Sequence, residues 1–283
     1  MNRNKSFDNN QPLIYLIATP IGNLSEISKR ALEVLQDMDV IAAEDTRNTF
    51  SLLSQYGIKK ELFSLREHNE NEASEHLIKL AQSGKKVAYV SDAGYPGISD
   101  PGYLLVKKAR QMGIGVSTVS GSCAFINALV ASGLPTNHFY FYGFLSKKGN
   151  EAKKSLEDLK EREETLIFYE SPHQIEDTIK LLYDVFGERN CVIARELTKI
   201  NEEYIYGTLL ELTKLDYKTI KGEMVIILEG NSTPKNQISD SEIQNKLKFY
   251  MSLGVTEKAA IQIAVEELKI PKNRVYKLAQ ELK

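Results

Sequence analysis

The sequence predicts an α/β fold built from two α/β domains, followed by a small helical region. In the first half, short apolar runs alternate with amphipathic segments that begin at capping residues, which is typical of β-α-β units. In the second half, strand-like runs come closer together, and beyond residue 230 the pattern is helical only. We therefore expect a disordered tail over 1–12, domains over 13–135 and 136–230, and a linker with helices over 231–283.

Composition excludes several classes of protein. Hydrophobic residues make up 42% of the chain and charged residues 26%, which indicates a folded globular protein rather than a disordered or fibrous one. The formal net charge of -2 gives no indication of a polyanionic partner, so RNA binding would depend on local basic patches. The two cysteines, Cys123 and Cys191, lack metal-ligand spacing, and the first dozen residues are polar. We expect a cytoplasmic protein without structural zinc.

The first domain is predicted from four strands and the helices between them. The apolar runs that we expect to form strands are 13–18, 39–43, 86–91 and 115–120. Ser28 is placed to cap the first helix, and the second helix is bounded by Asp45 or Thr46 and by Gly57.

Two further helices are predicted from their first residues. One follows Asn69, which forms a capping-box-like pair with Glu72, and ends at Gly84. The other begins at Asp100-Pro101, an N-cap followed by proline in the first helical position, and ends at Gly113.

The second domain reads as a mixed sheet. Its expected strands are 138–145, 165–171, 190–196, 202–207 and 222–230, with a charged helix over 147–163 and an amphipathic helix over 172–187. The close spacing of the later strands predicts antiparallel pairs. From Asp240 onward the pattern is helical, with breaks at Gly254 and Pro271.

Three loops at strand ends suggest a ligand site. SDAGYPGISDPG (91–102) follows a strand, and its small residues Asp92, Ala93 and Gly94 allow backbone groups to approach a ligand. It is neither a Walker A loop nor a GxGxxG turn. SGSCA (120–124) and ATPIGNL (18–24) are the other two loops. The plainer interpretation of each is a tight turn, with Asp100 capping its helix in the first.

Seven motifs occur in an order that matches one known family. They are TPIGNL (19–24), AEDTR (43–47), SDAGYPGISDPG (91–102), GFL (143–145), FYESPH (168–173), ARELTK (194–199) and GEMVIILEG (222–230). On these motifs the chain resembles the tetrapyrrole-methylase-like (class III) methyltransferases, and within them the ribosomal RNA (cytidine-2′-O)-methyltransferases of the small subunit. It departs from the family at Ser120, where a proline is frequent, and at Gln174, where an arginine is frequent.

The resemblance implies domains of the tetrapyrrole methylase type with S-adenosylmethionine bound between them, without a metal. It also implies a homodimer that acts on the small ribosomal subunit or its 16S rRNA. By motif position, the implied cofactor contacts are Pro20, Asp92, Ala93, Gly94, Ile98, Ser120, Ser122, Cys123 and Leu145. Two alternatives stay open: an enzyme of the same fold with a tetrapyrrole or protein acceptor, and a non-enzymatic assembly factor.

A ribose hydroxyl needs a route for its proton, and several polar groups are candidates. We predict catalytic roles for Glu44, Asp45, Arg47, His68 and Glu170, the last beside His173. The plainer interpretation is an Asp45 N-cap with a Glu44–Arg47 ion pair, and surface histidines. Arg195, Glu196 and Lys199 suit phosphate binding or bracing of the cleft, or simply contain a buried Arg–Glu pair.

Two lysine-rich segments are candidates for RNA contact. The first contains Lys147, Lys148, Lys153 and Lys154, and the second contains Lys272 and Arg274, flanked by Lys269 and Lys277. Clustered lysines can follow phosphates, although a solvated helix face is the ordinary interpretation of such runs.

Overall fold

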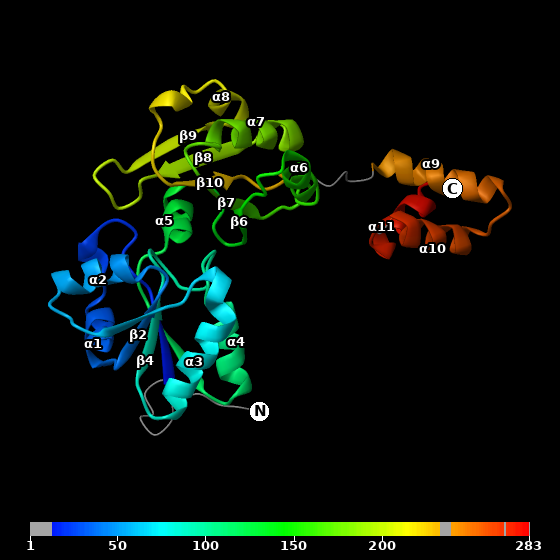
Figure 1. Ribbon diagram of the computed structural model, residues 1–283. Coiled ribbons are helices and arrows are strands. Elements are labelled where there is room, and N and C mark those ends of the chain that lie inside the picture. The colour runs from blue at the N-terminus through cyan, green and yellow to red at the C-terminus, as the bar shows by residue number, and fades with distance from the viewer. Residues whose placement is uncertain (1–12, 233–238, 269, 283) are drawn as a thin grey trace. The chain divides into compact units, whose positions relative to one another are not determined.

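A computed structural model describes residues 13–232, 239–268 and 270–282 (Figure 1). The predicted tail over 1–12 and Lys269 lie outside the described residues. The chain divides into two compact units, Met1–Asn231 and Ser232–Lys283, and each is described by itself.

The first sheet of the larger unit is entirely parallel. Its strands are β1 (Leu13–Ile17), β2 (Val40–Ala43), β3 (Glu61–Ser64), β4 (Val87–Val90) and β5 (Gly115–Val119), in the order β3-β2-β4-β1-β5. Helices α1 (Lys29–Asp37) and α2 (Thr46–Gln55) cover one face, and α3 (Glu70–Gln82) and α4 (Tyr103–Gln111) cover the other (Figure 1). The four predicted strands are confirmed, whereas β3 was not predicted.

The predicted caps of α1 and α2 are confirmed, and that of α3 is wrong. Ser28 Oγ accepts the Ala31 N–H at 3.1 Å, and Asp45 Oδ1 accepts the Arg47 N–H at 2.9 Å. The Asn69 side chain makes no cap hydrogen bond to α3. Instead its amide oxygen accepts the Arg66 N–H and its amide nitrogen donates to the Ser64 carbonyl, so it fastens the preceding turn.

The predicted start of α4 is also wrong. The helix begins at Tyr103, after Gly102 with φ 136°, and not at Pro101. The Pro101 carbonyl accepts the Gly97 N–H at 2.9 Å, which keeps this residue in the preceding turn. Glu70 Oε1, from the first turn of α3, accepts the N–H groups of Gly102 (2.7 Å) and Leu104 (2.9 Å). A carboxylate from another helix thus takes the capping role expected of Asp100.

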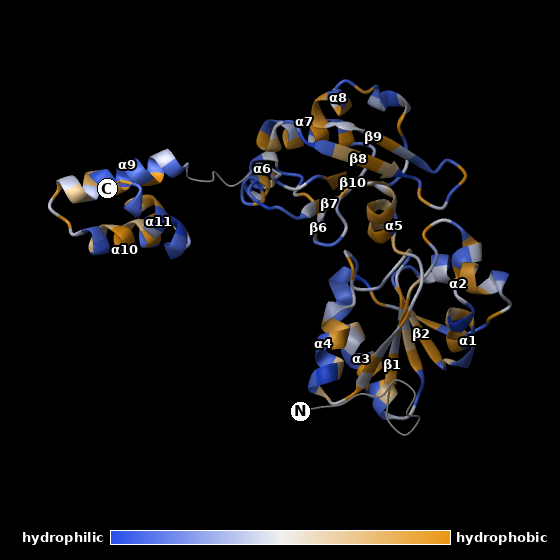
Figure 2. Cartoon of the chain, turned by 180° about the vertical axis from the view of Figure 1, so that it is seen from behind, coloured by the Kyte–Doolittle hydropathy of each residue, from blue (hydrophilic) through white to orange (hydrophobic). Residues whose placement is uncertain are grey.

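The second sheet is mixed, as predicted. Its strands are β6 (Phe139–Phe144), β7 (Thr165–Glu170), β8 (Asn190–Arg195), β9 (Glu203–Thr208) and β10 (Met224–Leu228), in the order β6-β7-β10-β8-β9. Only β6 and β7 pair in parallel. Helices α6 (Gly149–Glu157), α7 (Ile175–Phe186) and α8 (Leu209–Leu212) share a core with one face. Helix α5 (Ala124–Ala131) packs on the other and is hydrophobic over most of its length (Figure 2).

The described part of the smaller unit consists of three helices around their own apolar core. They are α9 (Asp240–Ser252), α10 (Glu257–Leu268) and α11 (Lys272–Gln280), with the breaks predicted at Gly254 and Pro271. None of the helices in the described part of the chain is both long and apolar enough to cross a membrane.

Candidate active site

The first sheet has a crevice at the point where the strand order reverses and where the helices that follow neighbouring strands lie on opposite faces of the sheet. Neighbouring strands β1 and β4 lead into helices on opposite faces, and in open α/β sheets this switch point is where ligands bind, at the carboxyl ends of the strands. Here the two connecting loops are joined, because Thr19 and Gly94 exchange two backbone hydrogen bonds of 2.9 and 3.1 Å. The loop that was singled out in the sequence therefore lies at this crevice.

A cavity of about 450 Å³ opens at this edge, within the usual size range of small-molecule sites. Loops of the first sheet line one side and the ends of β7 and β10 line the other. The lining residues are Ile21, Glu44, Asp92, Ala93, Gly94, Tyr95, Ile98, Ser99, Asp100, Cys123, Ala124, Phe144, Tyr169, Glu170, Ser171, Pro172, Leu197, Lys199, Glu223, Met224 and Val225.

Five of the nine predicted cofactor residues line this cavity: Asp92, Ala93, Gly94, Ile98 and Cys123. The other four, Pro20, Ser120, Ser122 and Leu145, lie one to three positions from a lining residue. Ser122 Oγ donates to Glu26 Oε2 at 2.7 Å, and Leu145 packs on the core of the second sheet. The side chains of Ser122 and Leu145 are thus held by neighbouring parts of the fold and do not line the cavity.

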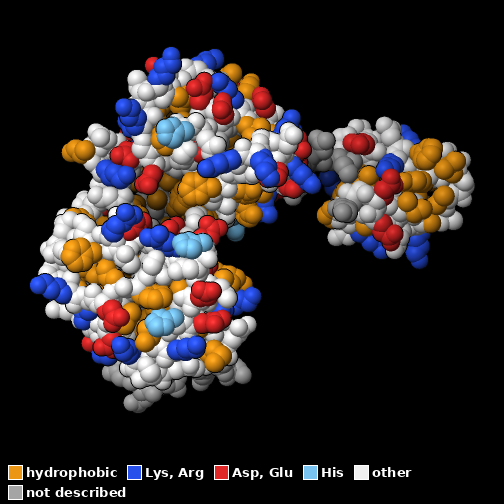
Figure 3. All heavy atoms as spheres, viewed as in Figure 1, with side chains coloured by type: hydrophobic (Ala, Val, Ile, Leu, Met, Phe, Trp, Pro, Cys, Tyr) orange, Lys and Arg blue, Asp and Glu red, His pale blue; other side chains and the backbone are white. Residues whose placement is uncertain are grey.

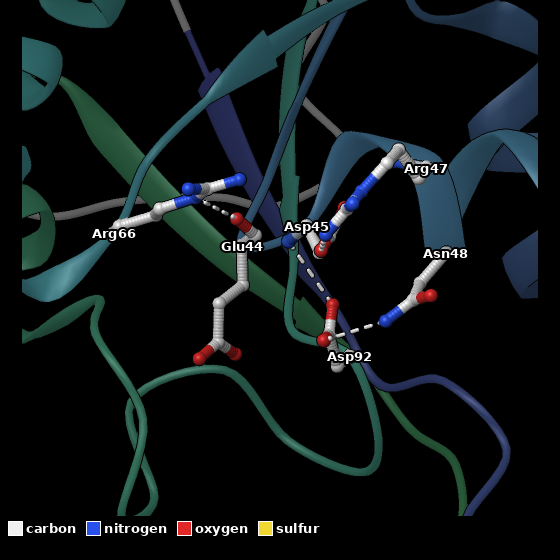
Figure 4. A network of polar contacts seen from close by, with 6 residues as sticks. All are labelled: Glu44, Asp45, Arg47, Asn48, Arg66 and Asp92. Carbon is white, nitrogen blue, oxygen red and sulfur yellow. Dashed lines mark hydrogen bonds and ion pairs between the residues drawn. The ribbon is translucent and has the colours of Figure 1, made fainter.

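Asp92 connects the cavity to the start of α2 (Figure 4). Its carboxylate accepts the backbone N–H of Asp45 at 3.0 Å and the side-chain amide of Asn48 at 2.8 Å. Both oxygens are therefore occupied by groups of the neighbouring connection. The Asp92 side chain thus braces two adjacent loops at the edge of the cavity.

In the AEDTR segment, the Asp45 N-cap of the plainer interpretation is confirmed and its Glu44–Arg47 ion pair is wrong. Arg47 pairs with Asp45, at 2.5 Å, and not with Glu44, and this guanidinium holds the pKa of Asp45 well below its usual range. Neither Asp45 nor Arg47 lines the cavity, and the Arg47 side chain is 84% exposed. Glu44 does line it: its backbone carbonyl accepts Arg66 Nε, whereas its carboxylate extends away from that guanidinium (Figure 4).

The remaining predicted catalytic residues divide between buried and exposed. Glu170 lines the cavity but is 6% exposed, and its two oxygens accept the Ser171 N–H (2.7 Å) and Thr178 Oγ1 (2.6 Å). His68 and His173 are exposed and lie outside the lining. Geometry therefore brings Glu44 and Glu170 to the cavity and leaves both histidines at the surface.

The sequence analysis missed functional candidates in both sheets. Asp100 lines the cavity although it was interpreted as a cap, and Tyr169 and Glu223 line it from the second sheet. Lys199, which the sequence analysis did name, lines it too, within 2.9 Å of Glu196 and 3.5 Å of Glu223. The expected Arg195–Glu196 pair is wrong, because Arg195 pairs with Glu203. In the sequence, Tyr169, Lys199 and Glu223 could have been identified by their positions in the family-like motifs FYESPH, ARELTK and GEMVIILEG.

The predicted RNA-binding lysines lie on exposed surfaces of two different units. Lys147, Lys148, Lys153 and Lys154 are exposed at and within α6, and Lys148 pairs with Glu151. In α11, Lys272 and Lys277 are exposed, and Arg274 pairs with Asp240 at 2.6 Å. On the face drawn in Figure 3, lysine and arginine alternate with aspartate and glutamate, so positive charge is local there.

Comparison with known families decides the class of this site. The family model of the Tetrapyrrole (Corrin/Porphyrin) Methylases matches residues 13–213. The chain belongs to this tetrapyrrole methylase family. Its fold is similar to the crystal structure of uroporphyrin-III-C-methyltransferase from Thermus thermophilus, with a TM-score of 0.55 and 20% identity over 77% of this chain and 94% of that one.

Curated relatives within the tetrapyrrole methylase family match nearly the whole chain. One is Ribosomal RNA small subunit methyltransferase I of Escherichia coli O157:H7, 43% identical over 99% of both chains. The protein of the same name from Bacillus subtilis (strain 168) is 41% identical, over 93% of this chain and 92% of its own. The predicted family and fold are confirmed.

Methyltransferases of this family use S-adenosylmethionine, and the cavity suits that cofactor. The cofactor carries a positively charged sulfonium, which a negative, partly apolar cavity stabilises. Among the described lining residues are the carboxylates of Glu44, Asp92, Asp100, Glu170 and Glu223 and the single amine of Lys199. In the described part of the chain, no cluster of His, Cys, Asp and Glu has the makeup of a metal site.

Proposed function

We propose that this chain transfers a methyl group from S-adenosylmethionine to the 2′-hydroxyl of a cytidine ribose in 16S rRNA of the small ribosomal subunit. The observation that carries the proposal is the carboxylate-lined cavity at the switch point of the sheet. Relatives of 41–43% identity, named as small-subunit rRNA methyltransferases, favour RNA over a tetrapyrrole acceptor. Ribosomal subunits place the reaction in the cytoplasm.

In this proposal the chain acts mainly by positioning. When bound, S-adenosylmethionine supplies an activated methyl group, so the protein must hold the acceptor hydroxyl in line with it. Asp92, Ala93, Gly94, Ile98 and Cys123 form the wall that binds the cofactor. Apolar side chains such as Leu197 and Val225 line the cavity as well.

The other predicted cofactor and catalytic residues have supporting roles. Pro20, Ser120, Ser122 and Leu145 shape the loops that carry the cofactor wall. Arg47, exposed at the start of α2 beside the cavity loops, can reach a phosphate of the RNA, and Asp45 orients it. Arg47→Ala should therefore reduce methyl transfer and leave cofactor affinity unchanged; full activity would remove this role.

RNA binding in the proposal uses the exposed lysines of α6 and α11. Duplex RNA hides its base edges, so an unpaired cytidine is the expected target. Binding through Lys153 and Lys154 would weaken as salt rises, because each phosphate contact releases counterions. A Lys153→Glu, Lys154→Glu double variant should bind subunits more weakly while retaining cofactor affinity. Lys107→Glu, in α4, is the matched control.

We also infer a homodimer, formed through the surface around α5. Ile126, Val130, Phe139 and Tyr206 are exposed there, and Tyr206 donates its hydroxyl to the Ala131 carbonyl. A helix that is hydrophobic on all sides is normally covered, and a second copy would cover it. Light scattering should find a dimer that Val130→Lys converts to monomers and that Phe50→Lys, on exposed α2, does not.

The deciding experiment uses labelled S-adenosylmethionine and small ribosomal subunits from cells that lack this gene. After the reaction, the RNA is digested to nucleosides and separated. Label in 2′-O-methylcytidine supports the proposal. Cofactor binding by calorimetry without label in any nucleoside contradicts it and favours an assembly factor or another acceptor.

A further inference from the structure

Asp100 is presented to the cavity by a strained turn. The Gly97 N–H donates to the Pro101 carbonyl at 2.9 Å, which closes the turn around Asp100. Ser99, immediately before it, has φ 62°, a left-handed conformation that is unfavourable for a residue with a side chain. Strain of this kind persists where the surrounding structure imposes it, and it concentrates at functional sites.

Among the described residues, the Asp100 carboxylate neither caps the helix that follows nor takes part in an ion pair. The helix that follows is capped by Glu70, which binds the N–H groups of Gly102 and Leu104. Among the ion pairs within the described residues, none includes Asp100. Its polar neighbour is the Ser91 hydroxyl, which also contacts the carbonyls of Ala93 and Gly94 at 3.4 Å.

The other carboxylates of the cavity wall are engaged. Asp92 holds Asp45 and Asn48, and both oxygens of Glu170 accept hydrogen bonds. Glu44 accepts the backbone N–H of Asp92, and Glu223 pairs with Lys199 at 3.5 Å. Among the described contacts, Asp100 is the lining carboxylate that pairs with neither a backbone N–H nor a cation, so it is the one best able to accept a hydrogen bond from a substrate.

Its surroundings also suit proton transfer near neutral pH. Burial, followed by the charge of Glu44 and that of Asp92, raises the pKa of Asp100 to about 7. Tyr89 lies beneath it in the first sheet, and Tyr169 and Glu223, with Lys199, face the cavity from the second. A general base is most effective when its pKa lies near the working pH.

We propose that the Asp100 carboxylate, which lines the cavity at the end of the turn after β4, accepts the proton of the acceptor hydroxyl during methyl transfer. The inference rests on the proposed function and names its proton acceptor. The hydroxyl oxygen forms its bond to the methyl carbon as the carbon–sulfur bond breaks, and the electron pair of that bond stays on sulfur. The O–H proton moves to an Asp100 oxygen and passes to water when the product leaves.

The first test is Asp100→Asn in the full chain. We expect kcat at pH 7 to fall by about 100-fold or more. The Kd for S-adenosylmethionine, measured by calorimetry, should change by less than about threefold. Replacing a residue that only stabilises the fold would not lower kcat while leaving Kd unchanged. The wild-type kcat should rise with pH through about 7, and the variant should lose that rise. Asp158→Asn, in an exposed position after α6, is the matched control and should behave as wild type. Full activity in Asp100→Asn, or a loss of affinity that parallels the loss of activity, overturns the proposal.

The second test needs no turnover. In ligand-free protein with ¹³C-labelled aspartate carboxyls, the resonance missing from Asp100→Asn should titrate near pH 7, and Glu44→Gln should move that titration to lower pH. Titration below about pH 5 overturns the proposal, whatever the activity. If the wild type transfers no methyl group to 16S rRNA, the proposed function fails, and this titration still decides whether Asp100 has the basicity inferred here.

Discussion

Two strand-to-helix connections of the same parallel sheet use aspartate in opposite ways. After β2, Asp45 caps α2 within its own connection and pairs with Arg47. After β4, the longer connection leaves Asp100 at the cavity, while Glu70 from α3 caps α4. The same residue type at two helix starts is thus satisfied in one place and available in the other.

The electrostatic consequences differ in sign. Arg47 lowers the pKa of Asp45, whereas burial and the neighbouring Glu44 raise that of Asp100 to about 7. A carboxylate that is satisfied locally stabilises the fold in its ionised form. One that is buried without a cation destabilises the fold when ionised, and this cost is typical of catalytic groups. Each of the following variants tests one part of this contrast.

The largest effect is expected from Gly102→Ala, which disrupts the connection after β4. Gly102 has φ +136°, and a Cβ there would lie 3.1 Å from the Gly97 nitrogen and from Tyr89 Cε1. We expect a loss of about 3 kcal/mol in the free energy of unfolding from strain and overlap. The control is Gly57→Ala, after α2, with φ +66° and open space, where about 1 kcal/mol is expected. Denaturant unfolding followed by circular dichroism measures both, and equal losses would contradict the close packing of this connection.

Glu70→Ala removes the external cap of α4. Two backbone N–H groups lose a charged acceptor, so we expect a loss of about 2 kcal/mol in the free energy of unfolding. Methyl transfer should fall as well, because Asp100 becomes the nearest substitute cap. Glu72→Ala, an exposed residue of the same helix turn, is the control and should have little effect on either quantity. A Glu70→Ala variant as stable as this control would show that α4 needs no cap from α3.

Asp100→Asn should stabilise the protein at pH 8 and leave it unchanged at pH 4. The unfolded chain loses the Asp100 proton near about pH 4, whereas the folded protein holds it up to about pH 7, so stability falls between these two values and levels off above them. For a fully buried group the difference would be about 4 kcal/mol, and partial exposure reduces it to about 1 kcal/mol. Thermal unfolding of wild type and variant at the two pH values measures it. The same difference at both would contradict a raised pKa.

Much of the fold was predictable because its strands are buried along their whole length. All residues of β2, β4 and β10 are buried, and each strand appears in the sequence as a continuous apolar run. Strand β3 was not predicted because it is a four-residue edge strand with no buried residue, so the sequence has no continuous apolar run there. The local caps at Ser28 and Asp45 were visible because donor and acceptor are two or three residues apart.

The candidate site was predictable only where its groups are local. The turn after β4 was identified from its glycine and proline residues, and five predicted cofactor residues line the cavity. The role of Asp100 was hidden because it depends on Glu70, 30 residues earlier in the chain, and no local pattern encodes that contact. The lining from β10 was equally hidden, since only tertiary packing places it opposite Asp92.

The smallest effect, and the sharpest contrast with Asp100, is expected from Asp45→Asn. Asparagine also caps helices, so the variant removes the charge and keeps the cap. Because Arg47 lowers the pKa of Asp45, the ion pair contributes stability above about pH 4 and loses it progressively as the pH falls. We expect a small drop in the melting temperature at pH 7 that shrinks below pH 4 and in high salt, since the Arg47 side chain is 84% exposed. Asp45→Asn and Asp100→Asn should thus change stability at neutral pH in opposite directions, although each removes one carboxylate from the same edge of the sheet. A rise in melting temperature for both would mean that total negative charge at this edge, rather than the local partner of each aspartate, sets its cost.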